Sequence, residues 1–135
     1  MIVDTSALLA FFDANEPLHA AVTDVLTSAR ELLVISPYVL AEVDYLVATR
    51  HGSAADLAVL DELTGGAWEL AALDLVDVQD ARAVIVNFVD QHIGLADASM
   101  VVLAGRYRTR VVATLDRRHF SVLRTLDGHA FDIVP

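Results

Sequence analysis

Short apolar runs alternate along the chain with longer segments in which apolar residues recur at helical spacing. The apolar runs are rich in branched side chains, which is typical of buried strands. A hydroxyl followed by proline at Ser36-Pro37 marks a helix start, and Gly52 marks its end. The pattern predicts strands at residues 1–4, 32–36, 68–73, 111–114 and 131–134. It predicts helices over residues 6–12, 16–30, 37–50, 54–63, 78–91 and 97–107.

Strands separated by helical segments predict parallel pairing with right-handed crossovers. We therefore expect an α/β fold in which a mostly parallel central sheet is flanked by helices on both faces. The length of 135 residues fits a single domain spanning residues 1–135. In such folds, ligands bind beyond the carboxyl ends of the strands. Residues that directly follow a strand are therefore the first candidates for a site.

The composition narrows the class of protein. Hydrophobic residues make up 56% of the chain, which argues against disorder. No apolar run approaches the roughly 18 residues that a membrane span needs, and the first basic residue is Arg30. We therefore expect a cytoplasmic protein with no membrane contact. The absence of cysteine excludes disulfides and thiolate metal sites, and the absence of lysine excludes any mechanism that needs one.

Acidic residues recur just beyond the predicted strands. Asp4 follows the first strand and Asp116 follows strand 111–114, while Asp97 begins a helix and Glu42 lies in the helix after strand 32–36. Clustered carboxylates repel one another, and a divalent cation removes that repulsion. Hard oxygen ligands point to Mg²⁺ or Mn²⁺. Each acid taken alone is more often a helix cap or a surface residue than part of a site. Periodicity does not choose between Glu42 and Asp44, which flank the same apolar stripe.

Four segments in order, MIVDTSAL, SPYVLAE, IGLADA and ATLDRRHF, give the chain a resemblance to PIN-domain ribonucleases, specifically the VapC toxins of toxin–antitoxin pairs. The resemblance covers the whole chain. It implies a catalytic, metal-binding quartet, with Asp4 and Asp97 as the firmest direct ligands, and hydroxyls that orient the carboxylates. His119 stands where the family often has another acid. The implied quartet is Asp4, Glu42, Asp97 and Asp116, and the implied hydroxyls are those of Ser6 and Thr114.

The resemblance implies a Mg²⁺- or Mn²⁺-dependent endoribonuclease that cuts tRNA or ribosomal RNA and so inhibits translation and growth. It also implies a homodimer that is held inactive by a VapB-type antitoxin. The alternative is a catalytically inactive PIN-fold interaction module. A receiver domain would need a lysine, and a haloacid-dehalogenase-type phosphatase would need a second aspartate at the position of Ser6.

Two further features concern partners. Six arginines and a single acid lie between residues 106 and 124, although the formal net charge of the whole chain is −10. Arg117 and Arg118 directly follow Asp116, so we expect them to bind the RNA backbone. The helices over 36–50 and 54–63 are rich in Leu, Val and Ala, and we expect an apolar groove there, including Leu57 and Leu60, for the antitoxin. The histidines show no metal-ligand spacing and are expected at the surface or at helix ends.

Overall fold

The computed structural model describes residues 1–135, which form a five-stranded sheet with every neighbouring pair parallel. The strands lie in the order β3-β2-β1-β4-β5. The α/β fold with a parallel central sheet is therefore confirmed. The strand bounds are Ile2–Val3 (β1), Val34–Ile35 (β2), Glu69–Leu70 (β3), Val111–Ala113 (β4) and Asp132–Val134 (β5).

The strand order places a switch point in the middle of the sheet. The chain leaves β1 toward β2 and β3 on one side, and only later returns to build β4 and β5 on the other side. Connections therefore run in opposite directions from β1 and from β4, and a crevice opens beyond the carboxyl ends of these two strands. Asp4 follows β1 and Asp116 lies just beyond β4, so both acids sit at this crevice.

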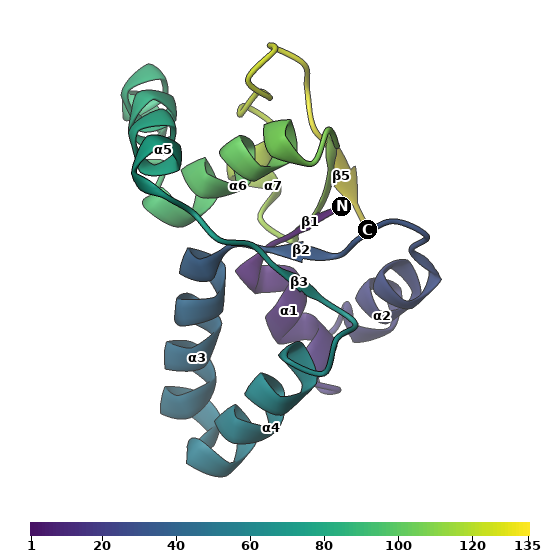
Figure 1. The fold of residues 1–135 in the computed structure, drawn as a ribbon. Coiled ribbons are helices and arrows are strands. Elements are labelled where there is room, and N and C mark those ends of the chain that lie inside the picture. Colours follow the sequence, from purple (N-terminus) through teal and green to yellow (C-terminus); the bar gives the residue numbers. More distant parts are fainter.

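Helices cover both faces of the sheet (Figure 1). The first four helices lie on one side, and α5 and α6 lie on the other. A cluster of 31 buried apolar residues joins the sheet to both layers. No helix combines the length and the apolar character that crossing a bilayer requires. The helix bounds are Thr5–Phe12 (α1), His19–Ser28 (α2), Pro37–His51 (α3), Ser53–Leu63 (α4), Leu75–Asn87 (α5), Leu95–Arg106 (α6) and Arg117–Phe120 (α7).

Local side-chain hydrogen bonds explain where the helix bounds differ from those predicted. The second helix begins at His19, later than predicted, because the Asp13 carboxylate accepts the Asn15 backbone N–H at 2.9 Å and holds a turn before it. Helix α5 begins earlier than predicted because the Asp74 carboxylate caps the N–H groups of Val76 and Asp77. The short helix α7 was not predicted at all, since four residues carry no apolar period.

A groove of about 670 Å³ lies between α1, α3 and α4. Its apolar side chains include Leu9, Phe11 and Phe12 of α1, Val47 of α3 and Val59 of α4. The expected groove therefore exists, but α1 forms one of its walls, which the sequence pattern did not indicate. Leu57 and Leu60 do not line it; Leu57 points to solvent with 61% of its surface exposed.

Candidate active site

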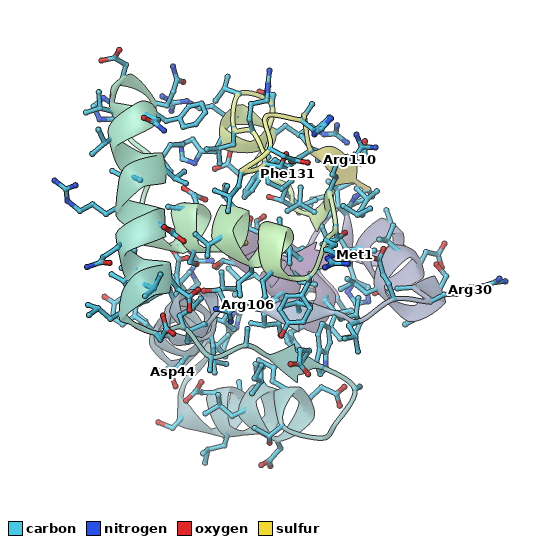
Figure 2. The ribbon with its side chains drawn as sticks, turned by 45° about the horizontal axis from the view of Figure 1, so that its top comes forward. Met1, Arg30, Asp44, Arg106, Arg110 and Phe131 are labelled. Atoms are coloured by element: carbon cyan, nitrogen blue, oxygen red, sulfur yellow. The ribbon has the colours of Figure 1, made fainter.

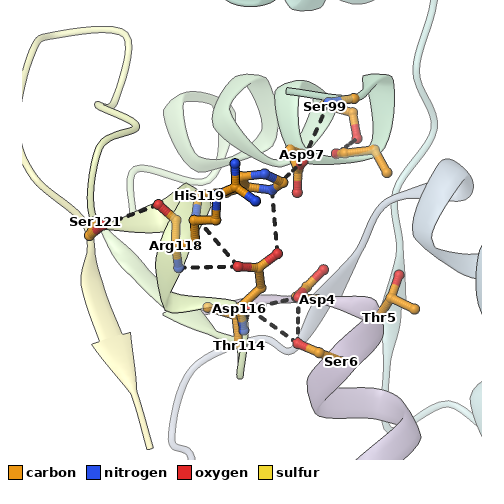
Figure 3. Close-up of polar contacts among 12 residues, drawn as sticks. Asp4, Thr5, Ser6, Asp97, Ser99, Thr114, Asp116, Arg118, His119 and Ser121 are labelled. Carbon is orange, nitrogen blue, oxygen red and sulfur yellow. Dashed lines mark hydrogen bonds and ion pairs between the residues drawn. The ribbon is translucent and has the colours of Figure 1, made fainter. Parts of the chain in front are cut away.

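Asp4 is buried at the carboxyl end of β1, and two hydroxyls hold one of its oxygens. Its backbone N–H donates to the carbonyl of Ala113 on β4 at 2.9 Å. Its Oδ2 accepts hydrogen bonds from Ser6 Oγ and from Thr114 Oγ1, both at 2.6 Å (Figure 3). No protein donor reaches Oδ1. The carboxylate is therefore fixed in orientation with one oxygen left for another partner.

The same two hydroxyls fix the turn that carries Asp116. Ser6 Oγ accepts the backbone N–H of Leu115 at 2.9 Å, and Thr114 Oγ1 accepts that of Asp116 at 3.0 Å. The two hydroxyl oxygens lie 3.2 Å apart. Ser6 and Thr114 thus connect the end of β1 to the end of β4, and they position two of the acids relative to each other.

Asp97 is the third residue of α6, and a buried contact holds the start of that helix in place. Ser99 Oγ lies 2.6 Å from Ser36 Oγ, the hydroxyl that caps α3. The Asp97 carboxylate also accepts the backbone N–H of Gly94 at 3.4 Å. The contact between Ser36 and Ser99 joins the start of α3, which follows β2, to the start of α6, which precedes β4. It is a positioning element that the sequence pattern did not indicate.

His119 lies between Asp97 and Asp116 rather than free at the surface, and only 20% of its side chain is exposed (Figure 3). Its Nδ1 is 3.1 Å from Asp97 Oδ2 and 3.4 Å from Asp116 Oδ2. Asp116 Oδ1 in turn caps α7 by accepting the N–H groups of Arg118 at 3.1 Å and His119 at 3.4 Å. Sequence spacing missed this contact because Asp97 belongs to a different helix.

Glu42 and Asp44 prove to face different parts of the molecule. Glu42 Oε2 accepts a hydrogen bond from Thr5 Oγ1 at 2.7 Å, so it lies beside the residue that follows Asp4. Asp44, labelled in Figure 2, lies on α3 close to Asp56 of α4. Of the two, Glu42 is the one that borders the acid cluster, which consists of Asp4, Asp97 and Asp116. Its carboxylate is exposed and sits at the rim, joined to the cluster through Thr5.

The electrostatics of the cluster are those of carboxylates forced together. Burial raises the pKa of Asp97 above its ordinary value; the nearby Asp4 and Asp116 carboxylates raise it further, whereas His119 and the Gly94 N–H oppose the rise. No arginine pairs with the cluster. The Arg117 guanidinium donates to the backbone carbonyl of Pro135. Negative charge at this edge of the sheet is therefore only partly balanced by protein groups.

The residues fit a hard divalent cation, although no three acidic or histidine side chains surround a common point as they stand. The donor set is carboxylate oxygen, which Mg²⁺ and Mn²⁺ prefer. One oxygen of Asp4 is free, and no arginine competes for it. The terminal torsion of an aspartate is soft, so the orientations of the Asp97 and Asp116 carboxylates can adjust to an ion.

The other arginines between residues 106 and 124 lie away from the acid cluster. Arg106 forms an ion pair with Asp77 of α5, and Arg124 donates to three backbone carbonyls that begin at Ser121. Arg110 directly precedes β4, at the opposite end of that strand from Asp116, and lies 3.5 Å from the Asp132 carboxylate of β5. Arg117 and Arg118, on α7, directly follow Asp116 and so adjoin the cluster.

Two comparisons with known proteins identify one family, and solved structures share the fold. The profile of the PIN domain matches residues 1–125. Ribonuclease VapC26 of Mycobacterium tuberculosis is 58% identical over 135 residues, covering 100% of both chains. In fold, the chain is similar to the crystal structure of M. tuberculosis VapC20, a Sarcin-Ricin loop cleaving toxin, with a TM-score of 0.79, 19% identity, and coverage of 86% of this chain and 89% of that one. It is also similar to FitAcB from Neisseria gonorrhoeae, with a TM-score of 0.65, 18% identity, and coverage of 97% and 96%.

Proposed function

Because the chain belongs to the VapC ribonucleases of the PIN-domain family, we propose that it is the toxin of a toxin–antitoxin pair. In this proposal it cuts structured RNA internally with the help of Mg²⁺ or Mn²⁺, and it thereby inhibits translation and growth. The substrate is a tRNA or a ribosomal RNA. The whole chain, residues 1–135, acts as one domain in the cytoplasm.

One observation carries the proposal: three carboxylates meet at the switch point of the sheet without an arginine to neutralise them. Asp4 is buried, and two hydroxyls each 2.6 Å away orient it. Burial and carboxylate repulsion already raise the pKa of Asp97. Protein stability alone does not require such an arrangement, because like charges placed together oppose folding. Its chemistry suits a cation that binds there and acts on a phosphate.

Each residue of the site has a distinct task in this proposal. Asp4, Asp97 and Asp116 hold the cation, which when bound activates water and stabilises charge on the phosphate oxygens. Ser6 and Thr114 keep the Asp4 carboxylate in one orientation, so little reorganisation is needed when the ion arrives. Glu42, at the rim and bonded to Thr5, completes the ligand set or orients the attacking water.

Arg118 is the better placed of the two arginines for the RNA backbone. Its backbone N–H is bonded to Asp116, which fixes the start of its side chain beside the acids, and its guanidinium has no partner in the protein. Arg117 donates to the carbonyl of Pro135 instead, and it would have to exchange this bond for a phosphate. Both side chains are exposed. A guanidinium beside a metal-bound phosphate favours docking in an otherwise acidic protein.

The catalytically inactive module is not supported as an alternative. All four acids of the quartet are present. Asp4 after β1, Asp116 after β4 and Asp97 in the first turn of α6 lie at one crevice. The full-length relative with 58% identity is named a ribonuclease. An interaction module would have no need for an aspartate buried between two hydroxyl donors.

The function is tested by incubating the purified protein with end-labelled tRNA and ribosomal RNA fragments, with Mg²⁺, with Mn²⁺ or with EDTA. We expect internal cleavage at defined positions with either metal and none in EDTA. Induction of the protein in a host without an antitoxin should stop growth. Cleavage that persists undiminished in EDTA would contradict the metal-dependent mechanism, and intact RNA under all conditions would contradict the nuclease assignment.

The groove between α1, α3 and α4 is the place where we expect the VapB-type antitoxin to bind. Its floor is apolar, with Phe11, Phe12 and Val47, and its polar lining has three acids, Asp13, Glu16 and Glu62, against one arginine, Arg50, and one histidine, His51. An amphipathic segment with basic flanks complements both features. Because Thr5 of α1 contacts Glu42 of α3, a segment that runs along these helices would also approach the acid cluster.

Neighbouring residues of α4 provide a matched test of this groove. Ala58 lines the groove, whereas Leu57 points to solvent. Ala58→Arg should weaken antitoxin binding at least tenfold, because the long side chain fills the groove, while Leu57→Ser should leave the affinity unchanged. Isothermal calorimetry with the cognate antitoxin measures both. Equal affinities would place the antitoxin elsewhere.

We further propose that the toxin is a homodimer. Helix α5 and the turn after it expose several large apolar side chains that the chain itself does not cover. Sedimentation equilibrium should give twice the mass of the chain. An acidic substitution at Val86 should reduce the measured mass to that of a single chain. The exposed residues are Leu75, Val76, Val86 and Val89, at 73%, 59%, 56% and 65% of their surface.

A further inference from the structure

His119 lies at the mouth of the acid cluster, where both its backbone and its side chain contact the acids. It lies on the single turn of α7, which is capped by Asp116, three residues earlier in the chain. The backbone N–H of His119 donates to Asp116 Oδ1 at 3.4 Å. The Nδ1 atom of the His119 side chain lies 3.1 Å from Asp97 Oδ2. Its place is therefore set both by its own helix and by a contact with α6.

His119 is also the only nitrogen-bearing side chain in contact with these carboxylates. Arg117 donates to a backbone carbonyl, and the Arg118 side chain contacts no acid. The other four histidines have no bond to these carboxylates: His19 bonds to the carbonyl of Ala10, His51 lines the groove between α1, α3 and α4, His92 is exposed, and His129 bonds to Asp127. Any nitrogen contributed by a side chain to an ion in the cluster must therefore come from His119.

The distances around Nδ1 resemble those between neighbouring metal ligands. In an octahedral site with metal–ligand distances of about 2.0–2.1 Å, adjacent ligand atoms lie about 3 Å apart. Nδ1 lies 3.1 Å and 3.4 Å from one oxygen of each carboxylate. As placed, the three side chains contact one another and do not yet enclose a common point. An ion that binds among them therefore requires these side chains to turn, and the terminal torsions of the two aspartates are soft.

We propose that His119 is a metal ligand, and that its nitrogen makes the site selective for a transition-metal ion such as Mn²⁺ over Mg²⁺. The inference rests on the proposed metal-dependent function and adds to it the identity of a ligand and the preferred ion. Imidazole is a good ligand for first-row transition metals, whereas Mg²⁺ prefers oxygen ligands and keeps its waters. A site made only of carboxylates has no nitrogen ligand by which it could prefer Mn²⁺ over Mg²⁺.

Pulsed electron paramagnetic resonance of the Mn²⁺-loaded protein tests the proposal without reference to activity. We expect a nitrogen hyperfine coupling in the wild-type protein and its loss in His119→Asn. Calorimetry should show Mn²⁺ affinity falling by about 10–100-fold in this variant, with little change for Mg²⁺. His119→Asp, which restores an oxygen ligand, should bind Mg²⁺ at least as tightly as the wild type and should no longer prefer Mn²⁺.

His129→Asn is the matched control, because His129 Nδ1 also lies 3.1 Å from a carboxylate oxygen, that of Asp127, but far from the cluster. It should retain the nitrogen coupling and both affinities. Absence of the coupling in the wild-type protein would overturn the proposal. So would an Mn²⁺ affinity that stays the same or rises in a folded His119→Asn protein, since the imidazole would then be a bystander or a competitor of the ion.

The outcomes separate this inference from the proposed function. If EDTA abolishes RNA cleavage but no nitrogen coupling is seen, the function stands and the role of His119 is wrong. If RNA is cut equally well in EDTA, the metal-dependent mechanism itself is wrong. Circular dichroism and thermal unfolding of each variant show whether it is folded before its affinities are compared.

Discussion

Two places in this molecule force aspartates together, and only one of them is built as a site. At the crevice of the sheet, Asp97 approaches Asp4 and Asp116, and burial together with these neighbours raises its pKa. Between α3 and α4, Asp56 lies close to Asp44, and burial followed by repulsion from Asp44 raises the pKa of Asp56. By carboxylate repulsion alone, the two places are similar.

Hydrogen-bond donors distinguish them. Asp4 is held by Ser6 and Thr114, and Asp97 by His119 and the Gly94 N–H. Asp56 Oδ1 is buried without any partner. The first group is therefore oriented for a ligand, whereas the second is an imperfection of helix packing. Repulsion between carboxylates identifies a candidate, and the surrounding donors decide whether it is a site.

The largest expected effect comes from removing one charge at each place. Asp97→Asn should lower the rate of RNA cleavage by at least about 100-fold, because it removes a carboxylate that would hold the cation, and the cation would stabilise charge on the phosphate. Asp56→Asn removes the same charge from the place that lacks such donors and should cleave at the wild-type rate. Single-turnover cleavage of labelled RNA measures both. A folded Asp97→Asn protein with full activity would remove the distinction between the two places.

A smaller effect is expected from the donors themselves. Thr114→Val preserves shape but removes one hydrogen bond to Asp4 and leaves the Asp116 N–H without its acceptor. Metal affinity should fall by about 10–100-fold, as is typical for groups that orient ligands. Thr49→Val, which loses only an exposed bond to the carbonyl of Tyr45, should bind metal normally. Calorimetric titration with Mn²⁺ decides whether the hydroxyl matters.

Both raised pKa values predict how stability depends on pH in metal-free protein. A carboxyl whose pKa is higher in the folded state is harder to ionise there, so its ionisation costs stability as the pH rises from about 3.9 through the raised value. Asp97→Asn and Asp56→Asn should each be more stable than the wild type at pH 7 in EDTA, and this advantage should vanish below about pH 3.9.

Urea unfolding at several pH values measures this difference, and added metal separates the two places. Mn²⁺ should stabilise the wild type and Asp56→Asn, because an ion that binds only the folded state raises its stability. It should stabilise Asp97→Asn far less. An advantage of either variant that is constant across the pH range would show that it does not arise from the ionisation of that carboxyl.

The sequence predicted the acids and the strand ends that carry them, because alternating apolar runs fix a parallel sheet and a parallel sheet fixes where its loops meet. It could not rank Glu42 against Asp44, since both flank one apolar stripe; the choice depends on which neighbour each one faces, Thr5 or Asp56. His119 was missed for a similar reason, because its contact with Asp97 joins two helices that are distant in the chain.

The smallest predicted effect concerns the RNA backbone, and it extends the comparison to arginine. Arg118 adjoins the acid cluster through Asp116, whereas Arg50 lies in the last turn of α3 and lines the groove between α1, α3 and α4. In an inactive Asp97→Asn background, Arg118→Ala should reduce the slope of log affinity against log salt by about 0.7–0.9, the value for one lost phosphate contact, because fewer counterions are released on binding. Arg50→Ala should leave the slope unchanged.

Fluorescence anisotropy with a labelled RNA at several salt concentrations measures both slopes. Equal slopes would mean that RNA does not approach the acids over α7, and its path would have to cross the opposite rim, where Glu42 lies.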